Sequence, residues 1–314
     1  MDPDHPANQA ANIDTRLKQQ RQQKKQDPTM SKLAPGLKAL INAPFARGDP
    51  TAAPARIREV YSAIASDAVR RNVGLKPWVV LSTAATFTLN APNALPVLHE
   101  VATASSAHDS SSSSSSDAAV RTAELIREVG LKCISFNGIP RSINCLNAFH
   151  AALPAEVKSR LETQPSRAPD ETTGPRGRAL WNSVYAPFED KLVTKLATSH
   201  PDLPVHILNS HYGPLLSEPA AEKRGNLAAT GRVLTSVIAI ACLRAQTGVG
   251  PQVLSHVFGL RKAIEDGSYK AAGEEEVEGA EWLAGDEGSE WLLKSVDSIS
   301  EALGGGNFAA RAKL

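Results

Sequence analysis

The chain of 314 residues contains little cysteine, almost no net charge and no long apolar run. Its three cysteines, Cys133, Cys145 and Cys242, lie far apart in the sequence and form no C-x-x-C pair. The sequence therefore supports neither a secreted disulfide framework nor a structural zinc site. We expect reduced thiols, an intracellular protein and no bound metal.

The charge balance and the lack of apolar runs argue against several kinds of partner. The chain has 34 Lys and Arg against 33 Asp and Glu, a formal net charge of +1, so no strong overall field attracts nucleic acid or an anionic membrane. Its apolar runs are shorter than the roughly 18 to 20 residues that span a bilayer, and the N-terminus has no apolar signal-peptide core. These absences predict a soluble protein that is not secreted, binds no nucleic acid and crosses no membrane.

The N-terminal region is polar. Residues 1–30 are rich in Gln, Asn, Asp and Lys, so burial cannot offset the entropy lost on ordering, and we predict a disordered tail. From Met30 to Arg47 the chain is basic and lacks acidic residues, as in a mitochondrial presequence that would require translation to start at Met30. The acidic residues upstream of Met30 argue against a presequence in the full chain. We keep the cytoplasm and the mitochondrial matrix as alternative compartments.

Helical periodicity dominates the rest of the chain and predicts an all-α fold. Two helices are apolar on nearly every side and should be buried, at residues 77–89 and after Val233. Amphipathic helices are expected at residues 55–72, 117–134 with Asp117 as N-cap, 140–153, 178–199 with a kink at Pro187, and 288–303. Strand-like alternation is nearly absent, and residues 203–216 are ambiguous.

Low-complexity and polar segments indicate how the chain is divided. We expect the tail (1–30), a first helical half (31–153) containing a serine-rich loop at 105–116, a polar linker (154–177), and a second helical half (178–314). The second half contains an acidic loop around Glu274–Glu278.

Two segments resemble a known superfamily. Residues 233–263, VLTSVIAIACLRAQTGVGPQVLSHVFGLRKA, contain an apolar helix, a glycine turn and a second helix with His256. Residues 123–149, AELIREVGLKCISFNGIPRSINCLNAF, contain a helix, a Gly-x-Pro turn and a following helix. Both are similar to the alkylhydroperoxidase D-like (AhpD-like) / carboxymuconolactone decarboxylase-like superfamily. The resemblance covers roughly residues 55–303 and implies its helical fold, built from two tandem copies in which His99 corresponds to His256.

The superfamily's peroxidase chemistry, as the resemblance implies it, uses two cysteines, a histidine and an upstream glutamate. With His256 as the reference, the cysteine positions are occupied by Val249 and Gln252, and the glutamate position falls near Val237. Because the thiolate is the nucleophile, this chain lacks the thiol peroxidase centre. Decarboxylase-type members work without the cysteine pair, so a lyase or isomerase stays open, and no cofactor is implied.

His256 is the candidate catalytic residue. It lies on a helical stripe of polar or small residues with Gln252, Gly259 and Ala263, beside a predicted core stripe of Val253, Val257, Leu260 and Ile264. Imidazole titrates near neutral pH, so His256 is either a general acid/base or a histidine hydrogen-bonded at a helix interface.

Five further residues are candidates for ligand binding beside Gln252. Arg232 and Arg244 flank the apolar helix and either bind a carboxylate in one cavity or extend to solvent. Arg141 and Asn144 follow Pro140 and either hold an anion at a helix N-terminus or cap it. His211 and His206 lie in a polar segment, where hydrogen bonds within the loop are favoured over a metal site.

The sequence leaves three hypotheses. The first is a degenerate AhpD-like protein, binding or converting a small organic acid as a lyase or isomerase through His256. The second is a catalytically inert helical scaffold, a homo-oligomer whose small-residue stripe forms the subunit contact. The third is a residual peroxidase-type oxidoreductase, which requires two cysteines within disulfide range.

Overall fold

The computed structural model describes residues 33–41, 43, 52–106, 114–271 and 273–304. The chain divides into two compact units, residues 1–49 and 50–314. In the described part of the first unit there is one helix, α2 (Pro35–Ile41). The predicted disordered tail (1–30) lies outside the described residues.

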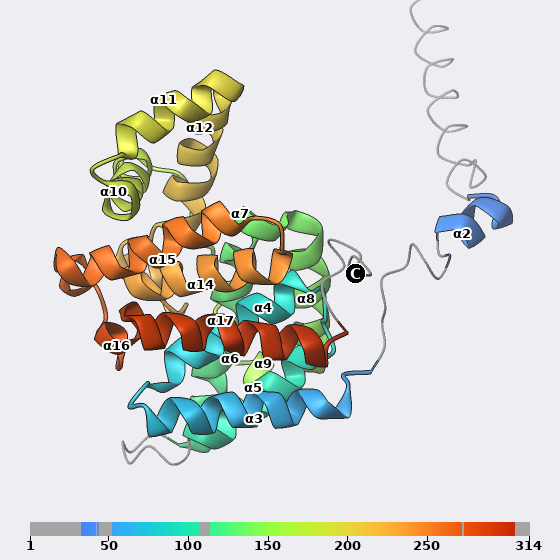
Figure 1. Cartoon of the computed structure of the whole chain (residues 1–314). Helices are drawn as coiled ribbons and strands as arrows, with labels where there is room; N and C mark the ends of the chain where they lie inside the picture. Colours follow the sequence, from blue (N-terminus) through green and yellow to red (C-terminus); the bar gives the residue numbers. More distant parts are fainter. Residues whose placement is uncertain (1–32, 42, 44–51, 107–113, 272, 305–314) are drawn as a thin grey trace, which may run out of the picture. The chain divides into compact units, whose positions relative to one another are not determined.

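The described part of the second unit is all-α, as predicted, and contains no strand (Figure 1). Its longer helices are α3 (Ala55–Arg70), α4 (Leu75–Thr88), α5 (Ala94–Ser106), α6 (Ser115–Lys132), α8 (Ile139–Ala152), α10 (Thr173–Tyr185), α11 (Glu189–Ser199), α14 (Gly231–Gln246), α15 (Gly250–Glu265) and α17 (Asp286–Ala302). Shorter elements are α7 (Ile134–Asn137), α9 (Ala155–Lys158), α12 (Asp202–His206), the π-helix η2 (Ile207–Leu216), α13 (Ala221–Arg224), the 3-10 helix η3 (Ser268–Lys270) and α16 (Ala280–Ala284).

Helices α4 and α14 pack against each other at the centre of this unit, as predicted for the two most apolar segments. Every residue of α4 from Pro77 to Thr88 is buried, and so are thirteen residues of α14. Helix α17 packs on both α4 and α14, α6 packs on α4, and α15 packs on α14 (Figure 1). A fully buried Leu, Ile or Phe side chain contributes about 1.5 to 3 kcal/mol, so this helix pair dominates the core.

The serine-rich segment contributes to two helices. Ser105 and Ser106 end α5, and Ser115 and Ser116 begin α6, while residues 107–113 lie outside the described part. Ser114 is the N-cap, with its side chain accepting from the backbone N–H of Asp117 at 3.2 Å. The prediction of Asp117 as N-cap was wrong, because a serine hydroxyl three residues earlier already caps the helix and the Asp117 carboxylate favours its first turn.

The predicted linker is packed rather than extended. Residues 154–177 contain α9 and the start of α10, and Val157 and Leu161 are buried in the main core. The single helix predicted at 178–199 is two helices, α10 and α11, separated at Ala186–Phe188. Pro187 has no N–H for a helical hydrogen bond and therefore breaks the helix instead of bending it. The ambiguous residues 203–216 are helical.

Candidate functional site

His256 lies on the buried face of α15, where only 8% of it is exposed. The stripe of small residues lets α10 approach, since a Cβ on Gly259 would lie 2.9 Å from Val184 Cγ1. The stripe suggested as a subunit contact is thus occupied by a helix of the same chain. The predicted core stripe was wrong in part: Val253, Val257 and Ile264 are only partly buried, because the small residues face the core.

The imidazole of His256 is contacted by a pair of tyrosines. The Tyr185 hydroxyl lies 3.5 Å from Nε2, and the Tyr212 hydroxyl donates to Tyr185 at 3.1 Å. If the two hydroxyls donate in series toward Nε2, that nitrogen is the acceptor and the proton of the neutral imidazole is on Nδ1. Nδ1 has no hydrogen-bond partner among the described residues. Burial, aided by the Arg232 guanidinium, lowers the pKa of His256 to about 4, so the ring is neutral at pH 7.

Arg232 is buried beside this histidine, with 4% of the residue exposed. Its Nη atoms donate to Ser236 Oγ (2.5 Å) and to the carbonyl oxygens of Ser183 (3.1 Å) and Gly259 (2.6 Å). Nε has no hydrogen-bond partner, and no described carboxylate lies within 4 Å of the guanidinium. A buried guanidinium without an ion pair and with a spare donor is the arrangement expected for the predicted role of Arg232, binding a carboxylate.

Two carboxylates fix the helix turn that carries Arg232. Glu218 Oε1 accepts from the backbone N–H groups of Thr230 and Gly231, at 3.0 Å each, and Glu274 Oε2 accepts from that of Arg232 at 2.6 Å. Gly231 has φ +61°, and a Cβ there would lie 2.3 Å from the Glu274 carboxylate, so only glycine fits. Carboxylates at a helix N-terminus satisfy its unpaired N–H groups and complement its dipole.

A fully buried lysine anchors this arrangement. Lys132 donates to the Leu216 carbonyl (2.8 Å), Glu218 Oε1 (2.5 Å) and Thr230 Oγ1 (2.7 Å). Although burial opposes ionisation, the Lys132 ammonium lowers the pKa of Glu218 to about 2. The sequence analysis missed this cluster, although Glu128 four residues before Lys132 on one helix was a signal for an ion pair.

His256 and Arg232 line adjoining cavities. His256 lines a cavity of about 10 Å³, near the minimum that one water molecule occupies. Arg232 lines a pocket of about 450 Å³, in the size range of ligand sites. Both cavities are lined by Leu180, Leu216 and Thr235, so these three side chains separate the arginine pocket from the histidine.

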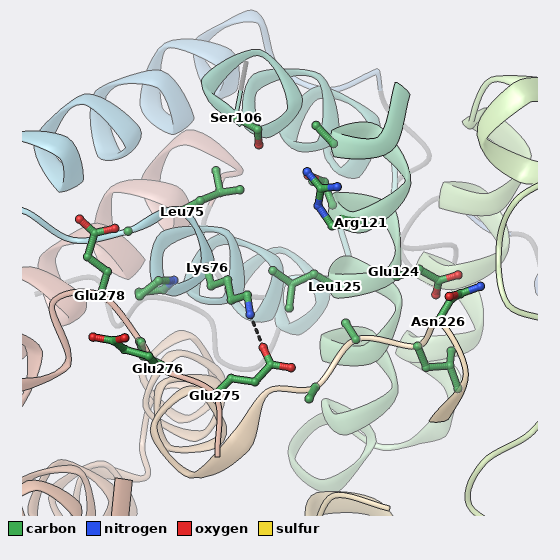
Figure 2. Close-up of a pocket in the computed structure, with 18 residues that line it drawn as sticks. Leu75, Lys76, Ser106, Arg121, Glu124, Leu125, Asn226, Glu275, Glu276 and Glu278 are labelled. Atoms are coloured by element: carbon green, nitrogen blue, oxygen red, sulfur yellow. Dashed lines mark hydrogen bonds and ion pairs between the residues drawn. The ribbon is translucent and has the colours of Figure 1, made fainter. Parts of the chain in front are cut away.

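A separate pocket of about 480 Å³ lies between the start of α4, helix α6 and the acidic loop (Figure 2). Lys76 forms an ion pair with Glu275, and Glu276 and Glu278 lie on the same side of the pocket as Glu275 (Figure 2). Its described lining includes no histidine, cysteine or predicted site residue. We therefore take the Arg232–His256 region as the candidate site.

The other residues on the two central helices lie apart from it. Arg244 forms a bidentate ion pair with Asp297 (2.8 and 2.7 Å) at the exposed end of α14. It follows Arg232 by twelve residues, or about 18 Å along the helix, so of the two alternatives for Arg244 the structure shows an exposed ion pair rather than a cavity shared with Arg232. Gln252 is exposed at the start of α15 and does not accompany His256 into the core.

Arg141, Asn144 and His211 also lie in other surroundings. Arg141 donates to the Thr88 carbonyl at the end of α4, and Asn144 donates to the side-chain Oδ1 of Asn90, just beyond that helix, at 3.4 Å. His211 Nδ1 lies 3.2 Å from Ser135 Oγ. In the described residues no group of three or more His, Cys, Asp or Glu is arranged to hold a metal ion.

Two cysteines approach each other, which their helix spacing did not predict. The sulfur atoms of Cys133 and Cys242 are 3.6 Å apart, and both residues are fully buried. Burial raises the pKa of Cys133 well above its usual range and that of Cys145 to about 12. The pair is close enough to form a disulfide after small rotations, but its thiols are poor nucleophiles while buried.

Tyr185, Tyr212 and Ser236 are members of the site that the sequence analysis missed. Tyr185 (α10) contacts His256, and Tyr212 (η2) donates to Tyr185, so both join the site only through tertiary packing, and their spacing in the sequence gives no signal for it. Ser236 follows Arg232 by four residues on α14, a helical spacing that could have signalled their contact. Tyr185 stands two residues before the helix-breaking Pro187, which marks a helix end but not a partner.

Comparison with known proteins gives one distant relative. The chain is 29% identical over 156 residues to Peroxisomal protein 2 of Saccharomyces cerevisiae, a match that covers 42% of this chain and 52% of the relative. The chain therefore spans about half the length of this curated relative. No family model and no solved structure matches the sequence. None of the described helices combines the length and apolarity needed to cross a bilayer.

Proposed function

We propose that this protein binds a small carboxylate-bearing metabolite at Arg232 and uses His256 to transfer a proton to or from it. The observation that carries the proposal is a pair of buried N–H donors, Arg232 Nε and His256 Nδ1, that have no acceptor among the described residues. A buried donor without an acceptor costs roughly 1 to 3 kcal/mol, so both groups favour an oxygen-bearing ligand.

The proton transfer follows from the tautomer of His256. A neutral imidazole that accepts from Tyr185 at Nε2 can donate its Nδ1 proton to a ligand oxygen or carbon while it takes the tyrosine proton. Burial raises the pKa of Tyr185 and opposes the tyrosinate that would form, and the Tyr212 hydroxyl and the Arg232 charge offset this in part. The ligand reaches His256 only when Leu180 and Leu216, which separate the two cavities, move aside.

We also propose that the chain is a divergent AhpD-like protein built from two related helical units. The central helices α4 and α14 pack together, and each is followed by a non-glycine residue with positive φ, Asn90 (+52°) and Thr247 (+62°). In both cases a buried histidine follows nine residues later (99 − 90 = 256 − 247 = 9). This common spacing supports an internal repeat.

Binding and proton transfer can be tested separately. Small mono- and dicarboxylates, beginning with benzoate and succinate, should raise the melting temperature of the protein, and Arg232→Met should abolish the rise. Arg244→Met, a change in an exposed ion pair on the same helix, is the matched control. Deuterium uptake by a bound ligand from D2O, followed by NMR and lost in His256→Gln, tests the proton transfer. Stabilisation that persists in Arg232→Met would contradict the proposed site.

We further propose that the protein resides in peroxisomes. The matched relative is named as a peroxisomal protein, and the proposal rests on that name. A fluorescent protein fused to the N-terminus of the chain should colocalise with a peroxisomal marker. Mitochondrial or diffuse fluorescence would refute the assignment.

A further inference from the structure

A second concave surface lies on the outer side of α15, against the corner where α10 passes into α11. This groove has a volume of about 930 Å³ and is lined on one side by Pro187, Phe188 and Leu192 and on the other by Phe258. Phe188 is 64% exposed and Phe258 59% exposed. Two large aromatic side chains that face one groove and remain in solvent mark a binding surface rather than ordinary surface variation.

The groove has basic residues on its rim. Lys191 and Lys195 lie one turn apart on α11, and neither has a carboxylate within 4 Å among the described residues. Arg261, in contrast, is paired with Asp286, and Lys262 donates to the Ala186 carbonyl. Glu265 and Asp266 also line the groove, but neither lies within 4 Å of the two α11 lysines, which therefore supply unpaired positive charge beside Phe188 and Leu192.

We propose that this groove binds a monomeric amphiphilic carboxylate with an alkyl chain. The chain would lie between Phe188 and Phe258, and the carboxylate would lie at Lys191 and Lys195. Charge complementarity selects an anion, and the volume falls within the roughly 300 to 1,000 Å³ of ligand pockets. The inference goes beyond the Arg232 site, because the carboxylate would lie on α11 at the surface and not at the buried start of α14.

Calorimetric titration of the full chain with octanoate, decanoate and dodecanoate, below their micelle concentrations, tests this inference. Affinity should rise about three- to fourfold for each methylene group that becomes buried. Dodecyltrimethylammonium, with the same chain and the opposite charge, should bind at least tenfold more weakly than dodecanoate. Equal affinity for the two amphiphiles, or no dependence on chain length, would overturn the proposal.

Variants on the surface locate the binding without disturbing the core. Phe258→Ser and the double change Lys191→Glu/Lys195→Glu should each weaken dodecanoate binding at least tenfold. Leu254→Ser, an exposed apolar residue one turn earlier on α15, and Lys294→Glu on α17 are matched controls that should bind normally. Arg232→Met should also bind dodecanoate normally, which distinguishes failure of this site from failure of the carboxylate site. Three results would refute the proposed amphiphilic-carboxylate site. The groove variants could still bind dodecanoate, Phe258→Ser could change the assembly mass, or the protein could bind anionic vesicles but not monomeric dodecanoate.

Discussion

The titration of His256 should make the protein less stable as the pH falls. Its pKa is about 4 in the folded protein, because burial and the Arg232 charge disfavour the imidazolium, against a reference of 6.5 in the unfolded chain. Above pH 6.5 both states hold a neutral ring, and the group contributes nothing. Between 6.5 and 4 the unfolded chain binds a proton that the folded protein does not, so the free energy of unfolding decreases with decreasing pH.

The size of the effect follows from the shift. A difference of 2.5 pKa units at 1.36 kcal/mol per unit gives a limit of about 3.4 kcal/mol, of which about 2 kcal/mol is lost by pH 5 and about 3 kcal/mol by pH 4. Burial also lowers the pKa of His99 and His211, so the wild-type curve alone does not isolate His256. The difference between wild type and His256→Gln removes their contribution.

Urea unfolding from pH 7 to pH 4 measures this difference. Glutamine keeps a polar group near Tyr185 but does not titrate. As the pH is lowered from 7 to 5, the free energy of unfolding of His256→Gln should therefore rise relative to that of wild type by about 2 kcal/mol. NMR titration of the His256 ring gives the folded-state pKa directly. Parallel pH curves for the two proteins, or a native pKa near 6.5, would refute the inference that the ring is buried and neutral beside Arg232.

Three further outcomes test the packing around the site. Gly259→Ala should destabilise the protein by about 1 to 2 kcal/mol in urea unfolding, because the new methyl group meets Val184. Val184→Ala in the same protein should relieve this loss. If the effects of the two substitutions on stability are additive, the contact between positions 259 and 184 is contradicted. Lys132→Met should cost about 3 kcal/mol, since it removes the nearer cation of the Glu218 carboxylate and leaves it Arg167 at 3.7 Å, and a change below about 1 kcal/mol would argue against the cluster. The three thiols should react with a thiol reagent only after denaturation, and rapid labelling of Cys133 or Cys242 in the native protein would show that they are accessible.

The periodicity of the sequence was sufficient to predict the all-α class and the two buried helices. Helices α4 and α14 are apolar on nearly every side, and no competing packing arrangement suits such segments. The breaks were harder to predict, because Pro187 is compatible with either a kink or a helix end, and the local sequence does not choose between them. The linker was mispredicted because Val157 and Leu161, two apolar residues in a polar segment, gain their burial from α6 and the core around it.

The candidate site shows a similar division between local and tertiary information. Arg232 was predicted from its place beside an apolar helix, but Arg244 met the same criterion, and Arg141 and His211 were proposed on other local grounds; these three lie elsewhere. What distinguishes Arg232 is that its guanidinium donates to carbonyl and hydroxyl oxygens and has no described carboxylate within 4 Å, although Glu218 and Glu274 line the same pocket. Arg244 has the charge of Asp297 beside it, so its guanidinium is already neutralised. A buried guanidinium without an ion pair leaves a position for an anion, and this property can be read only after the chain has folded around it.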